Sequence, residues 1–335
     1  MGISKRNTTL DAFKLLAAYM VVFIHNNLCG NVGVAVDAIA RFAVPLFFVS
    51  SGFFCYNNDA DKIKKKMIHI VKLFLFATLF YHCMNILLFV AQGQFEQIKD
   101  YFIGCFEIRT MLKFLLLNKP ESSTHLWFLL ALIYSYAIQL LVVKVKVPNK
   151  LVYILSGCAL VLHLILGEGL LVFGIALPIG LVRNFLLFGY PFFVFGMLMR
   201  RYSEKMVLIK GAVLSILLIV GIVESVMSSL FFGKNEMYVG TVLTVFSIVV
   251  FALKYPSIRC LQKLEPLCMC GTYIYIFHQM VGKSINIACK LAGVDTTTTL
   301  YLDIKPFAVC IISTVFAYIL VKAENKIKAK KLKKA

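Results

Sequence analysis

Residues 10–29 read LDAFKLLAAYMVVFIHNNLC, a largely apolar run with polar residues near both of its ends. A helix of about 20 such residues is long enough to cross the hydrocarbon core of a bilayer. The residues before the run contain no small-residue cleavage site, so we expect a retained first membrane span and not a removed signal peptide.

The rest of the chain has the same apolar character. Of its 335 residues, 60% are hydrophobic and 15% are charged, and the mean hydropathy is +0.85. Soluble domains contain about 45–50% apolar and about 25% charged residues. A single core cannot hide this excess, so the composition excludes a soluble enzyme, a disordered chain and a fibrous chain. It predicts an all-α, polytopic membrane protein forming a single domain over residues 1–335.

About ten segments are predicted to span the membrane. They are 10–29, 41–57, 67–91, 125–144, 150–167, 182–200, 207–232, 237–254, 268–291 and 304–322. Segment 168–181 is apolar but short and interrupted by Gly and Pro, so it is either a re-entrant loop or an eleventh span. The predicted outer segment 92–124 contains Phe95, Tyr101, Phe102 and Ile103, which suggest an interfacial helix.

The positive charge indicates an orientation. The chain has 35 Lys and Arg residues against 16 Asp and Glu residues, a net charge of +19. With the N-terminus inside, 23 of the basic residues fall in cytoplasmic segments and 9 in outer segments. The positive-inside rule therefore predicts that both termini are cytoplasmic. This distribution favours membrane lipids as a partner and excludes nucleic acid.

Ten cysteines do not indicate a disulfide framework or a metal site. Several lie inside apolar runs, where thiols act as small hydrophobic groups. Cys268 and Cys270 are too close for an ordinary disulfide, and they lack a second pair that would bind zinc. We expect no metal.

The first span carries the strongest candidates for chemistry, because ionisable residues inside a bilayer are costly. Lys14 and His25 are eleven residues apart, so they lie near one helix face and about 16 Å apart along the axis. Asp11 is three residues before Lys14 and can pair with it, and Asn26 follows His25. The alternatives are a Lys14 side chain that reaches the cytoplasmic interface and a His25 that only packs.

Later segments add further polar candidates. The stretch VPLFFVSSGFF at 44–54 contains Ser51, and its Pro and Ser-Ser-Gly predict a kinked, closely packed helix. His125 and Trp127 begin the fourth span. The alternative to a functional role for them is that they anchor the helix at the membrane interface. The remaining candidates lie in or beside later spans: Arg183, Arg200, Arg201, Glu224, Tyr273, Tyr275 and His278. The alternative for Arg200 and Arg201 is that they only mark the cytoplasmic end of the sixth span, as the positive-inside rule predicts.

These motifs resemble those of the acyltransferase-3 family of bacterial integral-membrane acyltransferases. Lys14 and His25 match the family's pattern of a basic residue and a histidine separated by ten residues. Similar stretches are VPLFFVSSGFF at 44–54, HLWFL at 125–129, FFVFGM at 192–197 and YIYIFH at 273–278. The chain departs from the family's usual Arg-Gly at Lys14-Leu15, where lysine keeps the charge but loses the planar fork of arginine.

The resemblance implies a multi-pass protein of the bacterial cytoplasmic membrane. It would transfer an acyl group, usually acetyl, from acyl-CoA to a sugar hydroxyl of an envelope polysaccharide or lipid-linked saccharide, with no bound cofactor. His25 would be the catalytic base and Lys14 would bind CoA phosphates or stabilise charge. Substrate binding would fall to the other candidates: Asp11, Asn26, Ser51, His125, Trp127, Arg183, Arg200, Arg201, Glu224, Tyr273, Tyr275 and His278.

Two other functions remain open from the sequence. A transporter of a small polar solute, or a flippase, would use His25, Glu224 and His278 as a proton or substrate path. Some members of the resembled family are the membrane part of serine racemases, for which amino-acid uptake is the implied role. A non-catalytic scaffold is disfavoured by the set of ionisable residues within the spans.

Overall fold

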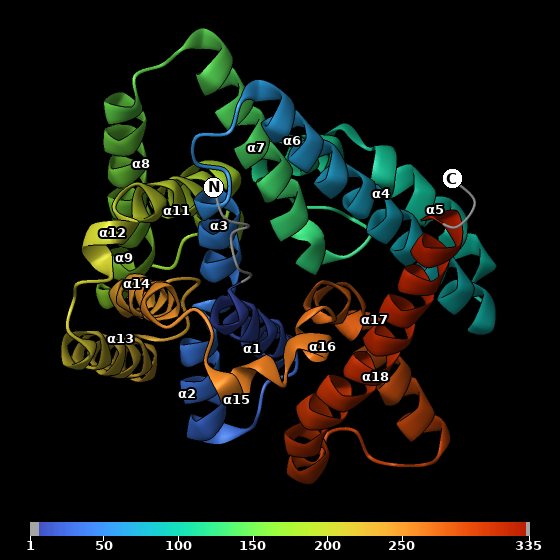
Figure 1. The fold of residues 1–335 in the computed structure, drawn as a ribbon. Helices are drawn as coiled ribbons and strands as arrows, with labels where there is room; N and C mark the ends of the chain where they lie inside the picture. Colours follow the sequence, from blue (N-terminus) through green and yellow to red (C-terminus); the bar gives the residue numbers. More distant parts are fainter. Residues whose placement is uncertain (1–6, 333–335) are drawn as a thin grey trace. The chain divides into compact units, whose positions relative to one another are not determined.

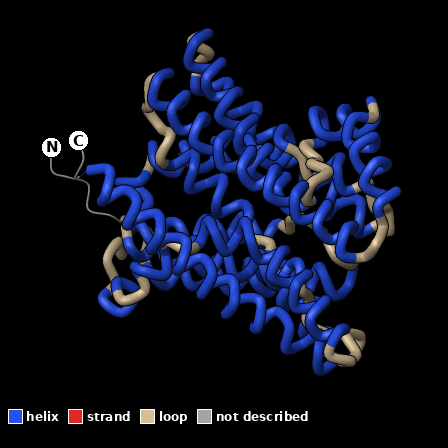
Figure 2. The backbone as a smooth tube through the Cα atoms, turned by 90° about the vertical axis from the view of Figure 1, so that its right-hand side faces the viewer, coloured by secondary structure: helices blue, strands red, loops and turns tan. Residues whose placement is uncertain are grey.

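The computed structural model describes residues 7–332, and every regular element in this range is a helix. No strand occurs within these residues (Figure 2), which confirms the all-α prediction. Among residues 7–332, seven helical runs are long and apolar enough to cross a membrane. They are Thr8–His25, Gly30–Phe53, Ala60–Ala91, Thr124–Val145, Asn149–Val172, Gly211–Phe232 and Thr299–Ala329. The chain is thus built as a multi-pass membrane protein, while ten spans and cytoplasmic termini stay predictions.

The chain divides into two compact units, and the first consists of Met1–Phe47 with Tyr202–Ala335. Its helices are α1 Thr8–His25, α2 Gly30–Ala40, α12 Ser203–Met206, α13 Gly211–Phe232, α14 Val239–Lys254, α15 Arg259–Gln262, α16 Glu265–Cys268, α17 Gly271–Leu291 and α18 Thr299–Leu332 (Figure 1). Helix α3, Ala43–Phe53, continues from this unit into the second.

The second unit is Phe48–Arg201. After α3 it contains α4 Ala60–Ala91, α5 Phe95–Phe106, α6 Ile108–Leu117, η1 Thr124–Leu126, α7 Trp127–Val145, α8 Asn149–Leu164, η2 Ile165–Gly169, α9 Leu170–Val172, α10 Ile179–Val182, η3 Phe185–Gly189 and α11 Tyr190–Arg201. Two of these elements, η2 and η3, are π-helical turns.

The second predicted span differs from the expected 41–57, because residues 30–40 form helix α2 and not an outer loop. The break between α2 and α3 falls at Arg41 and Phe42. Pro45 explains its position, because its ring excludes the carbonyl of the residue four positions earlier and it has no N–H to bond that carbonyl. The predicted kink therefore lies at the start of α3.

Close packing of α3, as predicted from its Ser-Ser-Gly, is confirmed within the second unit. A Cβ on Gly52 would collide with the carbonyl oxygen of Phe193 on α11. Likewise, a Cβ on Gly196 of α11 would collide with the carbonyl oxygen of Val49 on α3. Glycine at both positions lets the two backbones touch, as small residues do between membrane helices.

Two uncertain segments are now assigned. Residues 168–172, at the end of η2 and in α9, complete the helical run Asn149–Val172. After a loop, α10 provides only four residues, so segment 168–181 forms no separate helix long enough to be an eleventh span. The expected helix within 92–124 is present as α5, and a second helix, α6, follows it directly. Neither α5 nor α6 buries a residue.

Candidate functional site

The first unit places its candidate residues along the interface of α1 and α17. Leu15, Ala18 and Val22 of α1 share one buried cluster with Ile274 and Val281 of α17. Residues three and four positions apart lie on one face of a helix. His25 therefore continues the α1 stripe, since it lies three residues after Val22, and His278 lies on the α17 stripe between Ile274 and Val281.

The two histidines meet across this interface. The ring centroids of His25 and His278 are 5.2 Å apart, with 35° between the ring planes. His278 is fully buried, whereas His25 is half-buried. His278 Nδ1 lies 2.7 Å from the carbonyl oxygen of Tyr275. Because a carbonyl only accepts, Nδ1 carries the proton, and in the neutral ring Nε2 keeps its lone pair.

The predicted pairing of Asp11 and Lys14 is confirmed. Lys14 Nζ lies 2.5 Å from Asp11 Oδ1, and the side chains are 32% and 17% exposed, so the pair remains accessible. Helix α1 is continuous from Thr8 to His25, and eleven residues of helix set Lys14 about 16 Å from His25 along the axis. The charged pair and the histidine pair therefore occupy two levels of one helix.

Neighbouring polar residues of α1 and α17 differ in their surroundings. Asn26 is buried, donates from Nδ2 to the Val22 carbonyl at 3.0 Å, and lies against Gly282. Tyr275 is buried and its ring centroid is 6.4 Å from that of Phe47. These two residues thus extend the buried surroundings of the histidine pair.

Tyr273 and Glu224 make contacts elsewhere in the first unit. Tyr273 Oη donates to Glu324 of α18 at 2.9 Å. Glu224 of α13 accepts from the backbone N–H of Gly240 at 2.5 Å. Because Gly240 is the second residue of α14, this carboxylate satisfies an N–H that has no partner within its own helix. A structural role therefore accounts for the Glu224 contact.

In the second unit, His125 and Trp127 each have an aromatic or cationic neighbour. His125 is buried in η1, its Nδ1 lies 2.8 Å from Ser123 Oγ, and its ring packs edge-on to Tyr81 at 5.0 Å. The Arg183 guanidinium lies 5.1 Å from the centroid of the Trp127 ring. Trp127 and Arg183, 56 positions apart in the sequence, thus form a cation–π contact.

Arg200 and Arg201 at the end of α11 lie over different rings. The Arg200 guanidinium is 5.3 Å from the Phe53 ring, and that of Arg201 is 5.6 Å from the Tyr153 ring. Both arginines are exposed, while Ser51 is half-buried on α3. The two arginines therefore contact aromatic rings while their charges remain accessible.

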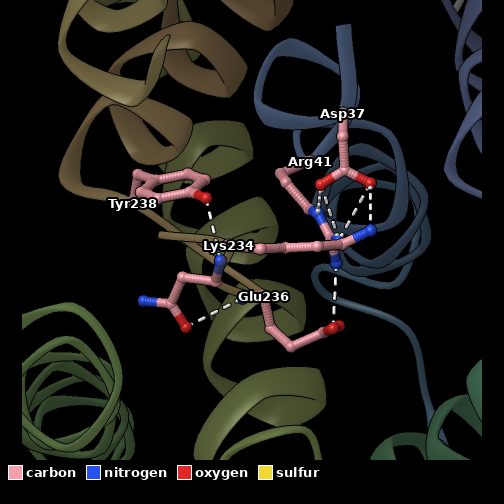
Figure 3. A network of polar contacts seen from close by, with 6 residues as sticks. Asp37, Arg41, Lys234, Glu236 and Tyr238 are labelled. Atoms are coloured by element: carbon pink, nitrogen blue, oxygen red, sulfur yellow. Dashed lines mark hydrogen bonds and ion pairs between the residues drawn. The ribbon is translucent and has the colours of Figure 1, made fainter. Parts of the chain in front are cut away.

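A buried ion-pair network escaped the sequence analysis (Figure 3). Arg41 contacts Asp37 at 2.8 Å and Glu236 at 2.9 Å, and Lys234 contacts Asp37 at 2.7 Å. The Arg41 and Asp37 side chains are 4% and 5% exposed. The network joins the end of α2 to the turn between α13 and α14. The i, i+4 spacing of Asp37 and Arg41 was a readable signal, but residues 30–40 were expected to be a loop.

Two further buried polar residues, His163 and Glu168, were not predicted from the sequence. His163 is fully buried at the end of α8, with its ring 5.2 Å from that of Phe188, and Glu168 is buried in the adjoining π-helical turn η2. Such turns are often found at functional sites. Among the residues the structure describes, no three His, Cys, Asp or Glu side chains group as metal ligands would.

Comparison with known proteins gives one match. The acyltransferase-3 family model, described as an acyltransferase domain, matches residues 7–322. The comparisons with curated proteins and with solved structures found no match.

Proposed function

Because the chain belongs to the acyltransferase-3 family, whose model spans nearly its whole length, we propose that it is a membrane-bound O-acyltransferase. The acyl donor is acyl-CoA, with acetyl as the transferred group. The acceptor is a hydroxyl of a cell-envelope polysaccharide or of a lipid-linked saccharide. The proposed location is the bacterial cytoplasmic membrane, with both termini cytoplasmic.

The observation that carries this proposal is the contact of His25 with His278, whose ring centroids are 5.2 Å apart. An acyl transfer to an alcohol needs a group that accepts the hydroxyl proton at neutral pH, and histidine is the residue type suited to that task. His25 is the base, because it is half-buried and so remains reachable, whereas His278 is enclosed.

The reaction then follows ordinary acyl-transfer chemistry. His25 takes the proton of the acceptor hydroxyl as the oxygen attacks the thioester carbonyl. The tetrahedral oxyanion collapses, the C–S bond breaks, and the CoA thiolate takes the proton back from His25. The products are the O-acylated sugar and CoA, and His25 returns to its starting state.

His278 acts in this proposal as a positioning residue. His278 Nδ1 donates its proton to the Tyr275 carbonyl. This hydrogen bond fixes the orientation of the ring and leaves the free lone pair on Nε2. A neutral neighbour with a fixed lone pair stabilises the protonated form of His25 during the reaction. Tyr275 and Asn26, which are buried nearby, complete the packing that holds the two rings.

Lys14 supplies a positive charge to the donor. Its ammonium is oriented by Asp11 at 2.5 Å and the pair is partly exposed, so an anionic ligand can reach it. In the proposed orientation Lys14 is on the cytoplasmic side of His25, which suits the phosphates of CoA. The candidates of the second unit, Arg200 and Arg201 above all, are further proposed contacts of acyl-CoA, because their charges are exposed.

The experiment that tests this function is acyl transfer in membranes containing the chain. Membranes are incubated with acetyl-CoA radiolabelled in the acetyl group and with envelope saccharide fractions. The proposal predicts covalent label on a saccharide, released as acetate by mild base. A transporter or flippase would leave no covalent label on any fraction, and that result would contradict the proposal.

A further inference from the structure

A half-open cavity of about 240 Å³ lies within the second unit and has no assigned role. It is enclosed by α4, by α5 and α6, and by the turn that follows α6. Most of its lining is apolar, formed by Phe106, Met111, Phe114, Leu115 and Pro120. Pockets with apolar walls and a few placed polar groups are the usual form of a small-molecule site.

Two of the lining residues, His82 and Ser122, are held by hydrogen bonds to Tyr101 and Asn85, which lie behind the lining. His82 Nδ1 lies 2.7 Å from Tyr101 Oη, and Asn85 Nδ2 donates to the same hydroxyl at 3.1 Å. Asn85 Nδ2 also donates to the backbone carbonyl of Ser122 at 3.0 Å. The bonds connect α4, α5 and the turn after α6, so the elements that enclose the cavity are held in fixed positions.

Two hydroxyl groups on this cavity lack partners among residues 7–332. Ser122 Oγ and Thr78 Oγ1 are both buried, make no hydrogen bond, and belong to residues that line the cavity. Ser122 as a whole is 3% exposed. A buried polar group without a hydrogen-bond partner is destabilising. A ligand that both donates and accepts hydrogen bonds would satisfy these two groups.

The surface around the cavity is that of a lipid-contacting segment. Leu75 and Leu79 on α4 and Leu112 and Leu116 on α6 are exposed. In a membrane protein such side chains contact hydrocarbon, so a lipid chain can enter the cavity from the bilayer without crossing water.

The charge at the cavity selects the head group. Glu121 is the acidic residue of the lining, and none of the lining residues is Lys or Arg. A phosphate or carboxylate placed against Glu121 would meet repulsion from its carboxylate, whereas a sugar hydroxyl donates to Glu121 and exchanges hydrogen bonds with Ser122 and Thr78.

We propose that this cavity binds an uncharged glycolipid, with its hydrocarbon chain against Phe106, Met111 and Phe114 and its sugar hydroxyls at Ser122, Thr78 and Glu121. The inference stands on the geometry of the second unit alone. Its test measures binding and not acyl transfer, so its failure would leave the proposed function untouched.

The test is photolabelling of the full chain in nanodiscs of phosphatidylethanolamine and phosphatidylglycerol. The probe is an alkyl glucoside with a diazirine in its chain. The same diazirine chain on a fatty acid and on phosphatidylglycerol provides two charged comparison probes. Labelled peptides are identified by mass spectrometry. We expect the glucoside to label residues 105–122 more strongly than either charged probe.

Three variants make the result specific. Ser122→Ala removes one unpartnered hydroxyl, so glucoside labelling should fall about fivefold without a lower unfolding temperature. Met111→Trp fills the cavity and should remove the label. Leu112→Trp is the control, since Leu112 is exposed beside Met111 and outside the lining, and should label as wild type.

Two results would overturn the inference. Equal labelling of 105–122 by all three probes would show ordinary lipid contact without a site. Unchanged glucoside labelling in Ser122→Ala would show that the hydroxyl wall binds nothing, and this second result decides even if Met111→Trp does not fold.

Discussion

The imidazole rings of His25 and His278 lie 5.2 Å apart, one on α1 and the other on α17. The first ring is half-buried and the second is enclosed. The same buried stripe of Leu15, Ala18 and Val22 that packs α1 in the first unit carries His25 to this position. Packing of apolar side chains thus determines where two titratable groups meet.

His278→Asn should lower kcat for acyl transfer by about 10- to 100-fold with little change in KM. The asparagine Nδ2 replaces His278 Nδ1 and can still donate to the Tyr275 carbonyl, so the helix should fold as before, but nothing replaces Nε2. Steady-state kinetics of the purified variant measure the effect. If the variant instead lost activity because it unfolds, the yield of folded protein would be reduced.

Lys14→Arg should keep activity within about threefold of wild type, because arginine preserves the charge and is the residue usual in the family. Lys14→Met should raise KM for acyl-CoA by about tenfold or more, since a charged hydrogen bond is lost. Initial rates measured over a range of acyl-CoA concentrations, at saturating acceptor, give the KM of each variant. Full activity of Lys14→Met at low acyl-CoA would contradict a donor-binding role.

Arg41→Met should strongly destabilise the first unit. The substitution leaves the Asp37 and Glu236 carboxylates without the guanidinium that both contact in a buried site. Breaking a buried ion pair from one side costs about 3–5 kcal/mol. Thermal unfolding in detergent measures the change. Lys62→Met is the control, because its pair with Asp59 is exposed and its loss should leave the unfolding temperature unchanged.

Gly52→Ala should destabilise the second unit by about 1–3 kcal/mol, because the added methyl group would meet the Phe193 backbone. Gly157→Ala on α8 is the matched control. A Cβ there meets nothing within 4 Å, and alanine favours a helix by about 1 kcal/mol over glycine. The prediction fails if the two variants unfold at the same temperature.

Alkylation of cysteines tests the predicted orientation. Cys29 lies between α1 and α2, at the end of the first predicted span that faces outside in the predicted orientation, whereas exposed Cys260 on α15 is predicted to be cytoplasmic. In single-cysteine variants, a membrane-impermeant maleimide added to intact cells should label Cys29 and spare Cys260. Labelling of Cys260 without cell lysis would invert the topology.

The rate at which the maleimide alkylates Cys29 should also depend on pH. Partial burial and the carboxylate of Asp303 raise the pKa of the Cys29 thiol. Because the thiolate is the reactive form, Cys29 should react slowly at neutral pH. Its rate should keep rising at pH values where an ordinary thiol has become fully ionised.

The sequence was sufficient for features set by local spacing. It predicted α1, the pairing of Asp11 with Lys14, and the close packing at Gly52, because helix periodicity and residue size determine each of these. It also nominated His25 and His278 separately. Their contact, and that of Arg41 with Glu236, depend on how distant helices pack, which no local pattern encodes. The break at Arg41 was readable from Pro45, but its consequence for residues 30–40 was missed.

The most direct test of the central claim is acyl transfer by His25→Ala in reconstituted membranes, with acyl-CoA and the accepted saccharide. His69→Ala, which changes an exposed histidine of α4, serves as the control. We predict that His69→Ala transfers acyl groups as wild type does, and that equal amounts of folded His25→Ala transfer none above background. Wild-type transfer by His25→Ala would contradict the assignment of His25 as the catalytic base.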